Sequence, residues 1–269
     1  MENVTFYFSL FKWGLLAGVF FAISTAFTSP YLLLQRNSLF PHALTHILLL
    51  SLFILSLIGS YVPIFLHLSI LLLITLILSA GIFLIIRFTH LFEDTATSLI
   101  TYLALALALI IATKSSQYDV ALLNYLFGSL IIVDKINVFE SLIVFILSFL
   151  IYLKYKNLWL AQSIEKEIPG INFRNSGFAF FFLITIQTII GVKLMGVLLV
   201  SAFFVYSGTL ALKLSSSFKG VVPLTAMFNL MAILLGFLLS MLFDFPFSAS
   251  AILIMSIYLI PLILKKGDV

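Results

Sequence analysis

Two histidines in one apolar segment are the residues of this sequence best suited to bind a metal ion. His42 and His46 stand four positions apart in the run SLFPHALTHILLL. Four residues make about one turn of an α-helix, so both imidazoles would lie on one face, where they can ligate a single ion. The alternative is structural, with His42 at the membrane interface and His46 hydrogen-bonded to a neighbouring helix. The spacing by itself leaves both open.

A carboxylate in a second apolar segment is the third candidate ligand. Asp244 lies between two phenylalanines in SMLFDFPFSA. In such surroundings a carboxylate needs a partner or water. With His42 and His46 it would form a two-histidine, one-carboxylate site whose remaining positions are open to water or to an exchanging ion. The alternative is that Asp244 caps a turn.

The composition shows where these residues must work. Of 269 residues, 63% are hydrophobic and 9% are charged, whereas a soluble domain carries about 25% charged residues. The net charge of +4 comes from basic residues that fall mainly between apolar runs, as in membrane proteins that keep positive loops inside, so nucleic acid is not an expected partner. Because the chain has no cysteine, its metal ligands are limited to histidine, carboxylate and hydroxyl groups.

We therefore predict an all-α, polytopic integral membrane protein that forms a single transmembrane domain over residues 1–269. About 20 apolar residues cross a bilayer, which gives about eight helices, within a range of seven to nine. The apolar N-terminus carries only Lys12 as a basic residue and is expected to be a retained span, not a signal peptide. The expected spans are 7–34, 42–58, 64–86, 95–113, 138–153, 177–190, 194–212, 221–243 and 247–264, with 177–190 and 194–212 forming a hairpin around Gly191 and Lys193.

Three further segments have their own expected structures. The apolar core of residues 119–134 is too short to cross comfortably, so a re-entrant or strongly tilted piece is expected as readily as a full span. Residues 154–176 and 207–220 are polar and predict cytoplasmic loops. Within the spans, Gln187 and Asn229 are expected to form interhelical hydrogen bonds, and Trp159 is expected in an interfacial aromatic belt.

Several motifs resemble the permease subunits of bacterial ATP-driven importers for zinc, manganese and iron. The run GVLLVSA at 196–202 matches the signature of that family residue for residue, although Ser207 and Leu212 replace its proline and arginine. The segment from Arg36 through Ala43-Leu44-Thr45-His46 also matches, with His42 in place of an aspartate. Near the end the matching residues are Ser240, Asp244 and Pro246, and shorter matches are YLFG at 125–128 and EDTA at 93–96.

The resemblance implies a function and a set of partners. It implies a homodimeric permease in the bacterial inner membrane, among membrane lipids, served by cytoplasmic ATP-binding subunits and an extracytoplasmic metal-binding protein. Residues 154–176 and 207–220 would contact the ATPase, and His42, His46 and Asp244 would form a transient transport site without a permanently bound cofactor. Because imidazole suits zinc and ferrous iron better than manganese, His42 slightly favours zinc as the transported ion.

Two other functional classes remain as alternatives. An ion-coupled or channel-type metal transporter would work without an ATPase, but paired intramembrane carboxylates and a detectable inverted repeat are lacking in the sequence. An intramembrane metalloenzyme is disfavoured because Ala43, Leu44 and Thr45 separate the histidines, where H-E-x-x-H would require a glutamate. The sequence contains no Walker-type glycine loop, so ATP hydrolysis would take place on another chain and no catalytic residue is expected in this one.

Overall fold

The computed structural model describes residues 2–58, 63, 66–89, 92–113, 128, 133–165 and 168–264. In these residues every regular element is helical: α1 (Glu2–Ala26), α2 (Ser29–Leu34), α3 (Phe40–Ile58), α4 (His67–Thr89), α5 (Glu93–Ala112), α7 (Lys135–Ile164), α8 (Arg174–Leu214), α9 (Phe218–Phe243) and α10 (Phe247–Leu264). Six stretches within the described residues are long and apolar enough to cross a membrane, and two shorter apolar helices accompany them. The predicted all-α, multi-pass membrane protein is confirmed.

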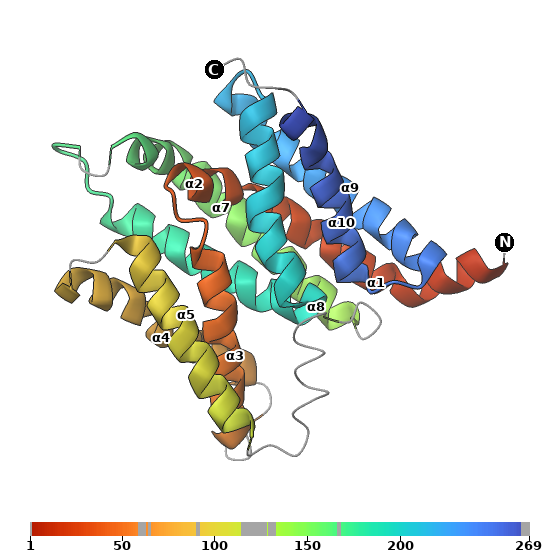
Figure 1. Cartoon of the computed structure of the whole chain (residues 1–269), viewed down its shortest axis with the longest axis horizontal. Helices are drawn as coiled ribbons and strands as arrows, with labels where there is room; N and C mark the ends of the chain where they lie inside the picture. The colour runs from red at the N-terminus through yellow and green to blue at the C-terminus, as the bar shows by residue number, and fades with distance from the viewer. Residues whose placement is uncertain are drawn as a thin grey trace.

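The helices form two groups that α8 joins (Figure 1). Helices α3, α4 and α5 pack on one another, with α5 offering α3 a face of small buried residues that include Thr101, Ala104 and Ala108. Helices α1, α7, α9 and α10 form the larger group around α8. Small side chains let helix backbones approach closely, which is the main source of packing energy between helices in lipid.

Helix α7 spans the distance between the two membrane surfaces. Its N-terminus is fixed by a capping box between Asp134 and Asn137. There the Lys135 ammonium lies over the Trp13 ring, an arrangement typical of a membrane interface. Lys154, which lies over the Tyr155 ring, follows 19 residues later, about 29 Å along the helix, and a hydrocarbon core is about 30 Å thick.

The basic residues indicate which surface faces the cytoplasm. Contacts of Trp159 with Tyr31, and of Tyr31 with Phe218, place the ends of α7, α2 and α9 at one surface. We call this surface the Arg36 end, and the surface that holds Lys135 the Lys135 end. The Arg36 end carries most of the described cations, which assigns it to the cytoplasm: Arg36, Lys154, Lys156, Arg174, Lys213 and Lys219, against Lys12, Lys135 and Lys193 at the Lys135 end.

The first predicted span is broken inside the protein. Helix α1 ends at Ala26 and α2 begins at Ser29, because Pro30 has no amide hydrogen and its ring clashes with the backbone of the preceding turn. Two tighter i to i+3 hydrogen bonds, from the Phe27 and Thr28 amides, close the end of α1. The break is buried, since Thr28 and Ser29 are completely shielded from solvent.

The expected hairpin of two spans is present, but its turn lies at Gly196 and not at Gly191 and Lys193. Residues 174–214 are helical on both sides of Gly196, where φ is 80° and ψ is 165° and the chain reverses its direction (Figure 1). A side chain strongly disfavours that backbone conformation, so the glycine determines where α8 bends. Gly191 is helical and serves instead as a packing site, because the rings and methyl groups of Phe21 and Val200 leave no room for a Cβ atom.

Both expected cytoplasmic loops are shorter than predicted. Helix α7 continues to Ile164 and α8 begins at Arg174, so most of 154–164 is helical. Likewise α8 continues to Leu214, and only 215–217 connect it to α9. Trp159 lies at the level of the Arg36 end but is fully buried among helices, and its indole donates a hydrogen bond to the Ser176 carbonyl. The contact of these segments with an ATPase stays a prediction.

The predicted re-entrant piece at 119–134 lies largely outside the described residues. Gly128 is described, and it joins two motifs that the sequence keeps far apart. Its φ is +64°, and a Cβ atom there would overlap the backbone of Met195 and Gly196. The glycine of YLFG therefore packs directly on the bend that begins GVLLVSA.

Candidate metal site

The two histidines come together as the sequence predicts. Pro41 lies in the first turn of α3, where a missing amide hydrogen costs nothing, and the helix then carries His42 and His46 on one face. Their ring centroids are 4.7 Å apart and the ring planes are nearly perpendicular, at 87°. Small rotations of the two side chains would direct one nitrogen from each ring to a common ion.

The two rings differ in their exposure. His42 is exposed, while His46 is partly buried, and its Nδ1 atom is shielded from solvent and has no hydrogen-bond partner among the described residues. A buried nitrogen without a partner costs on the order of 1–3 kcal/mol, so it is uncommon unless a ligand or water completes it. The structural alternative for His46 therefore finds no support at Nδ1.

The structure does not bring Asp244 to the histidine pair. Along α9, Phe218 contacts Tyr31 at the Arg36 end, whereas Phe237 contacts Phe11 near the start of α1. Asp244 follows the last residue of this 26-residue helix, about 39 Å from Phe218. Among the described residues no three His, Asp or Glu side chains lie close enough to hold one ion.

Asp244 has instead the geometry of a turn residue. It caps the C-terminus of α9 in the left-handed conformation, with a φ of 56°, and its side chain is exposed. The Ser240 hydroxyl donates a hydrogen bond of 2.7 Å to the Phe245 carbonyl across the turn. The S-x-x-x-D-x-P pattern thus encodes the connection between α9 and α10, and a metal-binding role for Asp244 stays a prediction.

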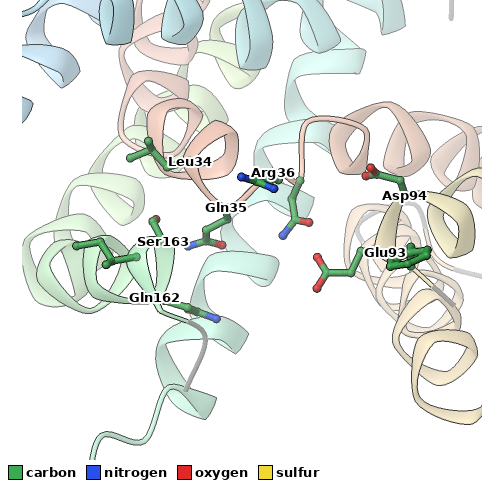
Figure 2. A pocket seen from close by; sticks show the side chains of 10 residues that line it. Leu34, Gln35, Arg36, Glu93, Asp94, Gln162 and Ser163 are labelled. Carbon is green, nitrogen blue, oxygen red and sulfur yellow. The ribbon is translucent and has the colours of Figure 1, made fainter. Parts of the chain in front are cut away.

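A polar cavity of about 630 Å³ opens at the Arg36 end, between the two helix groups. Figure 2 shows that it is bordered by the α2–α3 connection, the start of α5 and the end of α7. Glu93 and Asp94 extend from α5 towards the side that holds Arg36 and Gln162. Acidic residues at this position also suit the positive end of the α5 helix dipole.

A second cavity of similar size adjoins the first and is more apolar. The two share Gln35, Asn37, Glu93, Asp94 and Gln162, and the second continues along the start of α3 and of α8. Phe40 lines it two residues before His42, although neither histidine ring is among its described lining. The cavity therefore reaches the first residue of α3, two residues before His42.

The sequence pointed only weakly to this cavity. Glu93 and Asp94 belong to EDTA, one of the matching motifs, but their partners across the cavity come from segments about 60 residues away on either side. Gln162 lies in a segment that was predicted to be a loop, and Arg36 was noted as the start of a matching motif and not as part of a cavity. No spacing rule joins these positions, because α5 and α7 meet the α2–α3 connection only in the folded chain.

Comparisons with known proteins agree with the predicted family. The sequence model described as "ABC 3 transport family" matches residues 7–266. A high-affinity zinc uptake system membrane protein, ZnuB of Buchnera aphidicola, is 26% identical over 96% of this chain and 99% of its own. A manganese transport system membrane protein, MntC of Halalkalibacterium halodurans, is 24% identical over 95% and 89%. A protein of Haemophilus influenzae described as a probable iron transport system membrane protein is 25% identical over 94% and 92%.

A solved structure shares the fold. PsaBC from Streptococcus pneumoniae in complex with Fab aligns with a TM-score of 0.79 over 91% of this chain and 87% of the other. The sequences are 18% identical over the alignment, so this likeness concerns the arrangement of the helices alone.

Proposed function

The chain belongs to the ABC 3 transport family, and on that premise we propose that it is the permease subunit of an ATP-driven importer that moves a divalent metal ion into the cytoplasm. The observation that carries the proposal is the pair of imidazoles on α3, 4.7 Å apart, with a buried Nδ1 atom on His46 that has no partner in the part of the chain that the structure describes. Such a pair inside an apolar chain is costly unless it serves an ion.

Zinc is the ion that the ligands favour. Two imidazoles suit zinc, ferrous iron and copper, whereas manganese prefers carboxylate and water. The relatives named above belong to zinc, manganese and iron systems, so family membership does not choose among the three. Within one protomer the pair supplies two ligands, which is half of a tetrahedral zinc shell. A transported ion must also leave, and a site that is completed by water releases it readily.

The partners follow from the same premise. ATP hydrolysis takes place on separate cytoplasmic subunits that contact the Arg36 end, where the helical segment 154–164 and the α8–α9 connection lie. A second copy of this chain forms the homodimer, and its own His42 and His46 are candidates for the remaining ligands. An extracytoplasmic protein delivers the ion at the Lys135 end. The polar cavity beside Glu93 and Asp94 gives the ion an aqueous opening to the cytoplasm.

Reconstitution tests the proposal directly. Proteoliposomes would contain this chain with the ATPase and metal-binding proteins encoded beside its gene, and zinc, manganese and ferrous iron would be offered in turn. We expect zinc uptake that requires ATP. Uptake that is equal without ATP would favour the ion-coupled or channel-type alternative, and absence of uptake for all three metals would overturn the proposal.

A further inference from the structure

The break between α1 and α2 is held on its α1 side by side-chain amides. Gln187 of α8 donates to the Ser24 carbonyl at 2.8 Å and accepts a hydrogen bond of 2.8 Å from the Thr28 hydroxyl, so it bridges the break. Its amide also donates to Ser148 of α7 at 3.1 Å. From α9, Asn229 donates to the Ala22 carbonyl at 3.0 Å. Three helices therefore fix the end of α1.

The α2 side of the break is held differently. The Ser29 hydroxyl donates a hydrogen bond of 2.8 Å to the Phe204 carbonyl. One turn further along α8, a Cβ atom at Gly208 would overlap the Ser29 hydroxyl and crowd the end of Leu33. Helix α2 thus lies directly on the backbone of α8, with a glycine as the point of closest approach.

These two attachments lie on opposite sides of the bend in α8. Gln187 precedes Gly196, and both Phe204 and Gly208 follow it. The first half of α8 bonds to the end of α1 and to Thr28, and the second half bonds to α2, while Phe203 of the second half also packs on Phe21 of α1. A change of angle at Gly196 would therefore strain these buried hydrogen bonds unless the angle between α1 and α2 changed with it.

The connection from α2 to the histidines is continuous. Backbone hydrogen bonds run from the Arg36 amide to the Leu33 carbonyl and from the Asn37 amide to the Leu32 carbonyl, both at 3.0 Å. The Phe40 amide then donates to the Asn37 carbonyl at 3.1 Å, at the first residue of α3. Five residues separate the two helices, and their backbone is tied at both ends, so α2 and the first turn of α3 can move as one unit.

We propose that the contact of Gly208 with Ser29 is the mechanical coupling between the cytoplasmic end of α8 and the histidine pair. The second half of α8 ends at Leu214, within the segment 207–220 that the proposed ATPase would contact. A displacement of that half carries α2 with it, and α2 carries the turn that holds His42. Gly208 and Ser29 are in this sense positioning residues for transport. The inference rests on the proposed function and adds the path by which ATP hydrolysis would be coupled to movement at the histidine pair.

Helix packing elsewhere provides a matched control. At Gly236 of α9 a Cβ atom would lie 2.7 Å from the backbone of Ala251 in α10, so this is a second tight glycine contact within the membrane. It joins two helices outside the proposed route. Gly208→Ala and Gly236→Ala should both disturb helix packing, but only Gly208→Ala should change the amount of zinc that is moved per ATP hydrolysed.

The experiment measures zinc uptake and ATP hydrolysis together in proteoliposomes of the full complex. We expect Gly208→Ala to lower the zinc moved per ATP about fivefold, while Gly236→Ala leaves that ratio unchanged even if both lower the amount of folded protein. Ser29→Ala removes the hydroxyl that the new methyl group would strike. The double variant Gly208→Ala with Ser29→Ala restores the close contact of α2 with α8 without the hydrogen bond to Phe204, and should therefore recover the ratio up to the level of Ser29→Ala alone.

Several results would overturn the inference. An unchanged ratio in Gly208→Ala, an equal fall in Gly236→Ala, or absence of recovery in the double variant would each do so. Where Gly208→Ala does not fold, Leu33→Ala loosens the same contact by removing bulk, and an unchanged ratio there would count equally against the coupling. If the wild-type complex moves no zinc, manganese or iron, the proposed function itself fails, which is a separate result.

Discussion

Two regions of this molecule place polar groups inside an apolar protein, and they differ in whether those groups have hydrogen-bond partners. At the α1–α2 break, the Gln187 amide uses both its oxygen and its nitrogen in hydrogen bonds to α1, α7 and the turn between α1 and α2. At the start of α3, the buried Nδ1 atom of His46 has no partner and His42 is exposed.

The difference indicates which polar residues hold the fold and which remain available to a ligand. A group that finds partners within the protomer lowers the free energy of the folded state and has no reason to bind anything else. A group that is buried without a partner makes the fold less stable, and it stays available to any ligand that can reach it. Residue type alone does not separate the two cases, because all of these side chains lie in apolar runs.

The largest expected effect lies at the histidines. His46→Ala should lower zinc uptake at least about tenfold, because one of two protein ligands is lost. The thermal stability of the purified chain should stay the same or rise slightly, since the unpaired nitrogen is removed. Uptake would be followed with a zinc dye inside proteoliposomes.

A control on the same helix sharpens this result. Ser56→Ala removes a hydroxyl that bonds only to the Phe53 carbonyl of its own helix, at 2.7 Å, and should leave uptake within about twofold of the wild type. If His42 and His46 act as one site, the double alanine variant should be little worse than His46→Ala alone. A fall in stability with normal uptake would place His46 among the structural residues instead.

An intermediate effect is expected at the amides, and here stability is the measurement. Gln187→Leu should lower the free energy of unfolding in detergent by about 2 kcal/mol, because the Ser24 carbonyl, the Thr28 hydroxyl and the Ser148 hydroxyl each lose one hydrogen bond. Asn229→Leu should cost less, about 1 kcal/mol, since the Asn229 Oδ1 atom is itself buried without a partner and its removal offsets part of the loss.

Thr225 supplies the comparison for these two variants. Its hydroxyl bonds only to the Val221 carbonyl within α9, at 2.8 Å, so Thr225→Val should change the unfolding midpoint very little. If Gln187→Leu and Thr225→Val lowered the free energy of unfolding equally, the hydrogen bonds of the Gln187 amide would contribute nothing beyond ordinary packing.

The smallest effect is expected at Asp244. Asparagine accepts the left-handed backbone conformation almost as readily as aspartate, so Asp244→Asn should keep the turn and change zinc uptake less than about twofold. Asp244→Ala should lose some stability through backbone strain, on the order of 1 kcal/mol, with uptake per folded protein unchanged. If uptake in Asp244→Asn falls as far as in His46→Ala, Asp244 belongs with the ligands and not with the turn.

The sequence predicted a good part of the fold, and its errors have physical causes. The apolar runs located the helices because about 20 such residues must cross the bilayer, and Gln187 and Asn229 were correctly expected to form interhelical hydrogen bonds. Trp159 lies at the level of the Arg36 end but is buried among helices, and nothing in its neighbours in the sequence indicates that the Ser176 carbonyl would receive its indole. The turn of the hairpin in α8 was predicted at Gly191 and Lys193 instead of Gly196, because a glycine in a helix and a glycine at a break look alike until φ is known.

The candidate site divides in the same way. The i, i+4 spacing of His42 and His46 was enough to predict that the rings would meet, because a helix enforces that contact locally. Asp244 could be joined to them only by a tertiary arrangement, and the length of α9 places it at the opposite surface. The cavity at Glu93 and Asp94 depends on three segments and could not be located from spacing.

The sequence by itself determined that the chain is helical, crosses the membrane several times and carries two imidazoles on one helix face. These properties depend on hydropathy and on the helical repeat, which act over a few residues. The tertiary structure decided which polar groups form hydrogen bonds between helices. It also decided that the break after α1 lies beside α8, and that Gly208 lies against Ser29. Those outcomes depend on contacts between residues far apart in the chain, where the geometry of whole helices determines which side chains meet.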